Sequence, residues 1–465
     1  MCCAFSSMPG DVKAEAPGSA NSGCDGLRAE RVSLQLALSA SLERQPQYLI
    51  AQQEVEKARA GVVRAYSSFL PSVSATFEND HFVPANTQGR VAIVGNAVVG
   101  GQSETYTSYG SLSANLNLYN GGRDGAAYRA SKATHRASEA AMLSKLADTL
   151  EGVVVAYGDL YKAMAGVTEL GRVVASWRVM QVNAIERYKQ GHGTTLAIGQ
   201  VRNQLLDAER ELYQACHGWR DKSDSLVKAI GLPSAPGGLL AATGPVPPTA
   251  VVGRATEQLE AIVRADPAVM AAQEQLTAAY AKIDQAKGAF LPVVSLFGKK
   301  DFLGQSVSGI RPANGALGYD SYRVGIVLQQ PLGPFTTEYA ELASAKADAA
   351  KQEAVYQQTL IDARTKLSTA LSAYLEADDA AKSAAESVSE AEQLLSLTQS
   401  QFKAGRVARD SVEQAQVGLA KARRSSAEIA SDLSVASWRF NRSVQQTAFP
   451  QQVFETVNIT PDQAP

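Results

Sequence analysis

The sequence contains little cysteine and little histidine, which argues against two common ways of building or activating a protein. Only four cysteines occur in 465 residues. None has a Cys-x-x-Cys spacing, so a disulfide-rich scaffold is not expected. The four histidines are scattered and form no pattern typical of a metal site. We therefore expect no metal and no cofactor, and an enzyme is the less favoured class.

An excess of one charge and a long apolar run are also missing. Lys and Arg number 44 and Asp and Glu number 46, giving a net charge of −2. The chain thus lacks the basic excess of a nucleic-acid binder, and no nucleic-acid partner is expected. No 18 consecutive residues are apolar, so the sequence predicts no transmembrane helix. Apolar residues still make up 45% of the chain, enough for extensive burial.

The first 32 residues are expected to be a disordered leader, because they mix small, polar and charged residues. Ser22-Gly23-Cys24 is similar to a lipoprotein cleavage site. However, the segment from Met1 to Glu30 lacks the apolar core that a secretory signal requires. The mature N-terminus and any lipidation at Cys24 therefore stay open.

An internal repeat organises the rest of the chain. Phe69-Leu70-Pro71 and Phe290-Leu291-Pro292 each end a helical stretch that follows a proline at the same spacing. Later, Tyr188-Lys189-Gln190-Gly191 matches Phe402-Lys403-Ala404-Gly405. Such self-similarity predicts a duplicated unit. We expect repeats at 33–232 and 251–449, a Pro/Gly-rich linker at 233–250 and a polar tail at 450–465.

Each repeat shows the same predicted order of elements. A helix, Leu34 to Ser67 in the first repeat, ends at Leu-Pro because proline cannot continue the helical hydrogen bonds. Two strands and a very long helix follow, and a second helix of about 40 residues returns after a glycine. The long helices are expected at Arg123 to Gln190 and Thr336 to Ala404, and stretches of this length are typical of coiled coils.

The predicted strands Ser72 to Phe77 and Ser111 to Leu118 alternate apolar and polar residues, so each has one apolar face. In the second repeat Val324, Ile326 and Leu328 also alternate, although Val327 weakens the pattern, and the partner strand Val293 to Gly298 alternates poorly. Four such strands are too few to close a membrane barrel, for which eight is the smallest bacterial number. We therefore expect several chains to combine, with the apolar face toward lipid and the Ser/Asn face toward a lumen. The expected lipid-facing residues are Val73, Ala75, Phe77, Leu112, Ala114, Leu116, Leu118, Val324, Ile326 and Leu328.

Two further motifs precede the long helices at matching positions in the two halves. Leu118-Tyr119-Asn120-Gly121-Gly122 precedes the first long helix, and Gln330-Pro331-Leu332-Gly333 precedes the second. Together with the Phe-Leu-Pro segments and the Tyr/Phe-x-x-Gly turns, this order resembles the TolC family of bacterial outer-membrane export channels. The resemblance covers about residues 33 to 445.

The resemblance implies an α+β membrane protein in which a long α-helical coiled-coil barrel continues a transmembrane β-barrel. Four strands per chain and a homotrimer would give twelve strands. The implied location is the bacterial outer membrane, with the helices extending into the periplasm. The implied partners are outer-membrane lipid, a periplasmic adaptor protein and an inner-membrane ABC or proton-driven transporter, and the channel itself performs no chemistry.

The resemblance also places the turns after the two repeated glycines at a periplasmic tip that opens on docking. Charges at this tip could form ion pairs between protomers and a charged constriction, or could simply solvate a helix turn. Asp410 and Glu413 stand one position earlier than the acidic pair of the best-known members, so we expect no strong acidic ring. The tip residues are Gly191, His192, Gly193, Gly405, Arg406, Val407, Arg409, Asp410 and Glu413.

Three functions stay open at this point. Type I protein secretion is slightly favoured, because no reliable lipid-anchor signal is present and the tail after Phe449 is polar. Efflux of small molecules, drugs or metals is the alternative within the family. A soluble coiled-coil scaffold is the alternative outside it, although it does not explain strand pairs at matched positions.

Overall fold

The computed structural model describes most of the chain, at residues 29–83, 92–94, 97–99, 105–233, 238–247, 259–307 and 319–445. The expected tail at 450–465 and the first 28 residues of the expected leader, with Cys24, lie outside these ranges. The chain divides into two compact units. Of the described residues, those within 51–142 and 267–361 belong to the strand unit, and those within 29–50, 143–266 and 362–445 belong to the hairpin unit.

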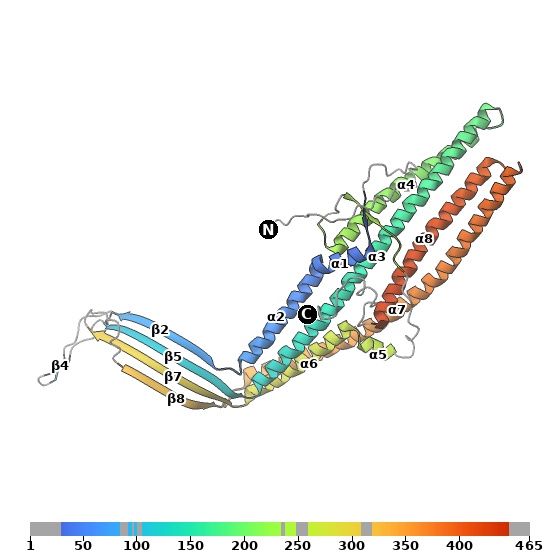
Figure 1. The fold of residues 1–465 in the computed structure, drawn as a ribbon. Helices are drawn as coiled ribbons and strands as arrows, with labels where there is room; N and C mark the ends of the chain where they lie inside the picture. Colours follow the sequence, from blue (N-terminus) through green and yellow to red (C-terminus); the bar gives the residue numbers. More distant parts are fainter. Residues whose placement is uncertain are drawn as a thin grey trace. The chain divides into compact units, whose positions relative to one another are not determined.

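Four antiparallel strands form the sheet of the strand unit, in the order β2-β5-β7-β8 (Figure 1). They are β2 (Ser72–Phe82), β5 (Thr105–Asn120), β7 (Val293–Val307) and β8 (Tyr319–Gln329). Each is longer than the segment expected from the sequence, and β2 and β8 are the edge strands within one chain. A short hairpin of β3 (Ala92–Val94) and β4 (Ala97–Val99) lies between β2 and β5 in sequence.

Alanine-rich helices make up the rest of the strand unit. These are α2 (Pro46–Ser67), α6 (Pro267–Lys287), the 3-10 turn η2 (Gly288–Phe290) and the first parts of α3 (Arg123–Lys189) and α7 (Thr336–Lys403). The buried alanines of α3 recur at spacings of four and three, the contact seam of a coiled coil: Ala126, Ala130, Ala133, Ala137 and Ala140.

Backbone contact explains the first Gly-Gly turn. Gly121 and Gly122 both have positive φ, at 59° and 79°, a region that other residues rarely adopt. A Cβ on Gly121 would lie 2.2 Å from the carbonyl oxygen of Gly288. Two chain segments far apart in sequence therefore cross here with no room for a side chain.

Aromatic contacts explain the two Phe-Leu-Pro segments. The Phe69 ring lies edge-on to Tyr128 of α3, with ring centroids 6.3 Å apart. In the second half, the Phe290 ring lies 5.1 Å from Tyr339 of α7 and 5.4 Å from Phe335. Each phenylalanine thus joins the end of a short helix to the start of a long one.

The hairpin unit contains two antiparallel helix pairs, α3 with α4 (Thr195–Ile230) and α7 with α8 (Arg409–Gln445) (Figure 1). Arg178 and Glu209 link the first pair at 2.9 Å, and Arg423 and Glu392 link the second at 2.7 Å. The unit also contains α1 (Leu34–Arg44) and α5 (Leu259–Arg264). None of the helices in the described ranges is both long enough and apolar enough to span a membrane.

The expectation of one helix from Leu34 to Ser67 was wrong. The helix is broken at Gln45, which is extended (φ −69°, ψ 114°) and separates α1 from α2. The following residue is Pro46, and proline disfavours helical geometry in its predecessor. The Gln45 side chain donates to the backbone oxygen of Ala229 at 3.1 Å, so the break is anchored to the end of α4.

A parallel strand pair was not foreseen from the sequence. The strand β1 (Glu30–Val32) pairs with β6 (Leu240–Ala242), which lies within the segment expected as a linker. Both contribute to the hydrophobic core of the unit, where the Tyr157 hydroxyl donates to the backbone oxygen of Val32 at 3.3 Å. Buried Cys216 belongs to a neighbouring cluster.

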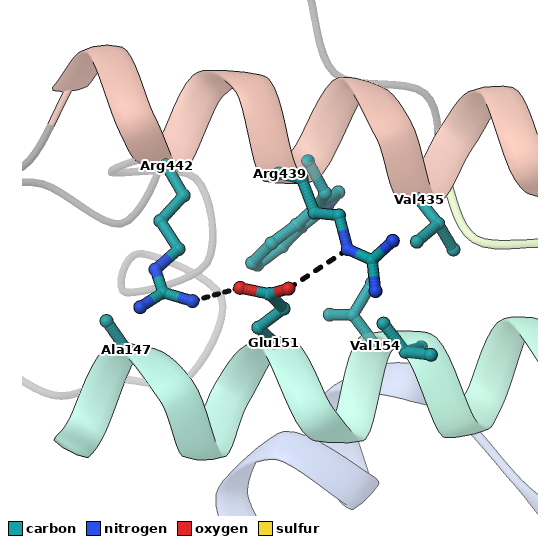
Figure 2. A pocket seen from close by; sticks show the side chains of 8 residues that line it. Ala147, Glu151, Val154, Val435, Arg439 and Arg442 are labelled. Carbon is teal, nitrogen blue, oxygen red and sulfur yellow. Dashed lines mark hydrogen bonds and ion pairs between the residues drawn. The ribbon is translucent and has the colours of Figure 1, made fainter. Parts of the chain in front are cut away.

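The helices α3 and α8 pack closely in this core. Ser431 donates to the backbone oxygen of Gly158 at 3.1 Å, and a Cβ on Gly158 would lie 3.0 Å from Val435. Figure 2 shows Glu151 of α3 between Arg439 and Arg442 of α8, both of which form ion pairs with it. Small residues thus bring the helices together and charged residues fix their alignment.

An ionic cluster links three helices of the hairpin unit. Asp159 of α3 lies 2.8 Å from Lys162 and 2.9 Å from Lys222 of α4, and Lys162 lies 2.7 Å from Asp432 of α8. Burial alone would raise the pKa of Asp159, but the hydrogen bonds from the two lysines outweigh it and hold this pKa below its ordinary value.

This cluster predicts a specific loss of stability in acid. Because the pKa of Asp159 is lowered by folding, its contribution is present above about pH 4 and disappears as the pH falls through the folded value. We expect Asp159→Asn to reduce stability at pH 7 by about 1 kcal/mol, and this difference should shrink as the pH falls through the lowered folded pKa of Asp159. Thermal unfolding between pH 3 and 8 checks this, with the exposed Asp221→Asn as control. A pH-independent difference would contradict it.

Candidate channel surfaces: the hairpin ends and the two faces of the sheet

Both helical hairpins turn with the same backbone geometry. At the end of α3, the amides of Gly191 and His192 donate to the carbonyls of Tyr188 and Arg187 at 3.0 and 2.9 Å. At the end of α7, Gly405 and Arg406 donate to Phe402 and Gln401, both at 2.9 Å. These paired bonds are those of a Schellman motif. In this motif the residue that donates the first bond adopts a left-handed backbone conformation. Gly191 and Gly405 supply it, with φ of 83° and 72°.

The residues after the first glycine start the returning helix α4. A Cβ on Gly193 would lie 2.9 Å from the backbone nitrogen of Tyr188, so only glycine fits without movement. Thr194 then caps α4 by accepting from the amide of Ala197 at 3.2 Å. His192 is exposed at this turn, as are Arg406 and Arg409 at the second turn, where Val407 is half-buried.

Asp410 joins the two hairpin ends of one chain. It lies in the first turn of α8, and its carboxylate accepts a hydrogen bond from the Asn183 side chain of α3 at 3.0 Å. The same carboxylate forms an ion pair with Arg187, also on α3. We call these three residues the clasp. Sequence reasoning selected Asp410 but missed both α3 partners, because nothing local in the sequence marks a contact 223 positions away.

Glu413 does not extend from the tip as its charge suggests. It is 7% exposed, and Arg409 lies 3.9 Å from its carboxylate. Glu413 lines a groove of about 400 Å³ between α3, α7 and α8. Ser176 of α3 donates to Gln416 of α8 across this groove at 3.2 Å. The part of the chain that the structure describes contains no cluster of three His, Cys, Asp or Glu residues arranged to hold a metal ion.

The predicted apolar positions of the strands share one face of the sheet. Residues directly opposite one another in antiparallel strands lie on the same face. Val73 is opposite Ala114, which is opposite Gly298 and then Val324. In the neighbouring rows, Ala75 is opposite Leu112, and Leu116 is opposite Leu296, which is in turn opposite Ile326. We call this the apolar face. Phe77 and Leu328 also lie on this face, and Leu328 is opposite Val294.

Two features of this face differ from the simple alternation. Leu118 has no register partner in β7, because a bulge shifts the pairing between Asn117 and Tyr119. Tyr119 then takes the position opposite Val294. Lys300 also lies on the apolar face, opposite Leu112. Its ammonium group lies 4.8 Å from the centre of the Phe302 ring and 3.5 Å from Asp320.

The opposite face of the sheet is polar, and we call it the polar face. Ser74 and Ser113 share a hydrogen bond of 2.7 Å between β2 and β5. Ser295 of β7 donates to the Asn117 side chain at 3.1 Å. Among the tyrosines of the strands, the side chain of Tyr106 is outside the described residues, whereas Tyr322 lies exposed on the apolar face.

The comparisons with known proteins agree with this architecture. The family model described as Outer membrane efflux protein matches residues 37–232 and 259–442. The chain belongs to this family. The two matched segments fall within the two repeats expected from the sequence, and the resemblance to the TolC family is confirmed. No match was found among curated proteins.

Several solved structures share the fold of this outer membrane efflux protein. The Campylobacter jejuni CmeC outer membrane channel is 17% identical, with a TM-score of 0.74 and coverage of 98% of this chain and 99% of that one. The outer membrane protein VceC of Vibrio cholerae is 16% identical, with a TM-score of 0.68 and coverage of 88% and 95%. The open state of the Neisseria gonorrhoeae MtrE channel is 19% identical, with a TM-score of 0.64 and coverage of 87% and 88%.

Membership of the outer membrane efflux protein family establishes the general class of this protein. Channels of this family are non-enzymatic transport proteins of the outer membrane that extend into the periplasm. They trimerise and work with periplasmic adaptors and inner-membrane transporters. The protein is therefore an outer-membrane efflux channel, and a soluble coiled-coil scaffold is excluded.

Proposed function

We propose that three copies of this chain form a channel-tunnel through which substrate is exported across the periplasm and outer membrane. The observation that carries the proposal is the four-stranded sheet, with one exposed apolar face, one polar face and an edge strand on each side. Such edges are normally covered or paired. Three copies joined edge to edge give twelve strands in one closed barrel, with the apolar face toward lipid and the polar face toward the lumen.

The second long helix supports a trimer independently. Only four of the 68 residues of α7 are buried in the single chain: Ala349, Ala363, Leu367 and Ala384. Leu375, Leu394 and Leu397 of this helix are more than half exposed. A helix of this length is stabilised mainly by packing of an apolar face, so α7 needs further helices to cover it. Neighbouring protomers of a tunnel would supply them.

For the cargo, we propose efflux of small molecules rather than secretion of a protein. The family is described by efflux, and the structures similar to this chain include the channels CmeC and MtrE. The slight preference for type I secretion rested on the composition of the chain ends, most of which lie outside the described residues. The partners we propose are a periplasmic adaptor and an inner-membrane transporter, without a cofactor and without catalysis by the channel.

Conductance of the purified protein tests this function. Detergent-solubilised protein added to a planar lipid bilayer should produce discrete current steps, and cross-linking should give a trimer. Leakage without discrete steps, or a monomer that binds no detergent, would contradict the proposal.

The orientation of the sheet predicts opposite effects for two adjacent residues of β5. Leu116 lies on the apolar face and Asn115 on the polar face. Leu116→Arg should cost about 2 to 4 kcal/mol per protomer if this face meets the bilayer midplane, and heat-resistant trimers should be lost. Asn115→Arg places the same charge in the lumen and should assemble normally. Normal assembly of Leu116→Arg would show that the assigned orientation is wrong.

The clasp predicts a change in gating. Arg187 and Asp410 connect α3 with the start of α8, so breaking their ion pair should loosen a closed tip. This pair is partly exposed, and its loss should raise the open fraction about two- to fivefold. Single-channel recordings of Arg187→Gln and Asp410→Asn should therefore show higher mean conductance.

Two further variants define the specificity of this effect. Arg409→Ala removes a charge 3.9 Å from Glu413 on the same turn and should act more weakly than Asp410→Asn. Arg202→Gln, on the exposed surface of α4, should have no effect. If all of these variants conduct like the unchanged channel, the clasp and Arg409 do not belong to the gate.

A further inference from the structure

The polar face of the sheet contains a compact charged cluster that spans three strands. The hydroxyl of Tyr109 on β5 donates to Asp301 of β7 at 2.6 Å and accepts from Lys299 at 2.7 Å. Lys299 also lies 3.0 Å from the Asp301 carboxylate, and Arg323 of β8 lies 3.2 Å from its other oxygen. Both oxygens of the carboxylate are thus in contact with these three neighbours.

The register places the two cations side by side. Lys299 is directly opposite Arg323, with Ser113 on the other side of Lys299. Asp301 lies one row farther along the same face, opposite Ser111. Like charges in directly opposite positions destabilise a sheet. Asp301 can neutralise only one of them, so stability alone does not explain why both are present.

The charge that this cluster presents to its surroundings is positive. The Asp301 side chain is 13% exposed, whereas Lys299 is 32% and Arg323 is 64% exposed. The carboxylate is therefore covered, and both cations remain accessible from the polar face. Farther along the same face the charge is reversed, because Glu78 and Asp80 of β2 are exposed there.

We propose that Arg323 and Lys299 form an anion-attracting ring in the barrel lumen. The proposal rests on the proposed function, in which the polar face lines that lumen. Three protomers would place six cations at one level of the pore, and rings of Arg and Lys select anions. The solutes favoured by this ring carry carboxylate or phosphate groups. Asp301 and Tyr109 are positioning residues that hold the two flexible cations against the pore wall.

Ion selectivity in a planar bilayer tests the ring. The reversal potential in a potassium chloride gradient gives the permeability ratio of chloride to potassium. Arg323→Gln and Lys299→Gln should each lower this ratio about twofold or more. Glu78→Gln, which removes a negative charge from the same face, should raise it. Lys300→Gln is the matched control, since Lys300 follows Lys299 in sequence but lies on the apolar face, and it should leave the ratio unchanged.

The positioning role of Asp301 has its own readout. Asp301→Asn should raise the chloride preference and also increase the noise of the open-channel current, because the two cations lose their anchor. Asp301→Glu should restore a quiet current. A variant that changes only thermal stability would overturn the positioning role.

A measurement on the unchanged channel tests the ring without requiring that any variant folds. Tripolyphosphate should block the current, and high salt should relieve the block because it screens the ring.

If the unchanged channel conducts but tripolyphosphate has no effect, the ring is overturned and the channel function stands. The same conclusion follows if Arg323→Gln and Lys299→Gln keep the original reversal potential. If Lys300→Gln alone shifts the potential, the other face lines the pore and the ring is likewise overturned. If no channel forms at all, the proposed function fails and the ring with it.

Discussion

The structure depends on the fact that one chain cannot complete its own sheet. Four strands present an apolar face and a polar face, with β2 and β8 as edges. In a single chain, both faces meet the same solvent and the edge strands are left to pair elsewhere. The long helix α7 has the same property, because almost all of its 68 residues are accessible. Assembly of several chains around one axis satisfies the edges, the apolar face and the helix together.

The matching segments of the two halves form similar junctions, but the charged residues near them are not equivalent. Both Phe-Leu-Pro segments place a phenylalanine against aromatic residues at the start of a long helix, and both hairpins turn through a glycine with the same hydrogen bonds. The charged residues differ between the halves. The acidic member of the clasp belongs to the second hairpin and the basic member to the first, so the two hairpins complement one another.

Much of the fold could be predicted because its signals are local. Alternation indicated three of the four strands and the internal repeat indicated the fourth, β7, while glycine and proline located the ends of the long helices within about one residue. The errors occurred where distant segments meet. The break at Gln45 is coupled to the end of α4, and β6 becomes a strand only because β1 lies beside it. The bulge at Leu118 depends on the register of a strand from the other half of the chain.

The same distinction applies to the candidate sites. Asp410 could be selected from its place beside a turn, but Asn183 and Arg187 could not, since nothing distinguishes them from the other polar residues near the end of α3. Lys299 and Asp301 were not selected because their strand alternates poorly, and only the register shows that they share a face with Arg323. A charged residue within a strand acquires its meaning from its cross-strand neighbours, which no local pattern records.

The most direct test of the account is the shape of the assembled protein. Protein extracted from membranes with detergent can be imaged by negative-stain electron microscopy. The account predicts hollow particles with three-fold symmetry, a detergent belt and a stalk of about 100 Å, the length of a helix of this size. Solid rods or flexible threads, obtained without detergent, would contradict it.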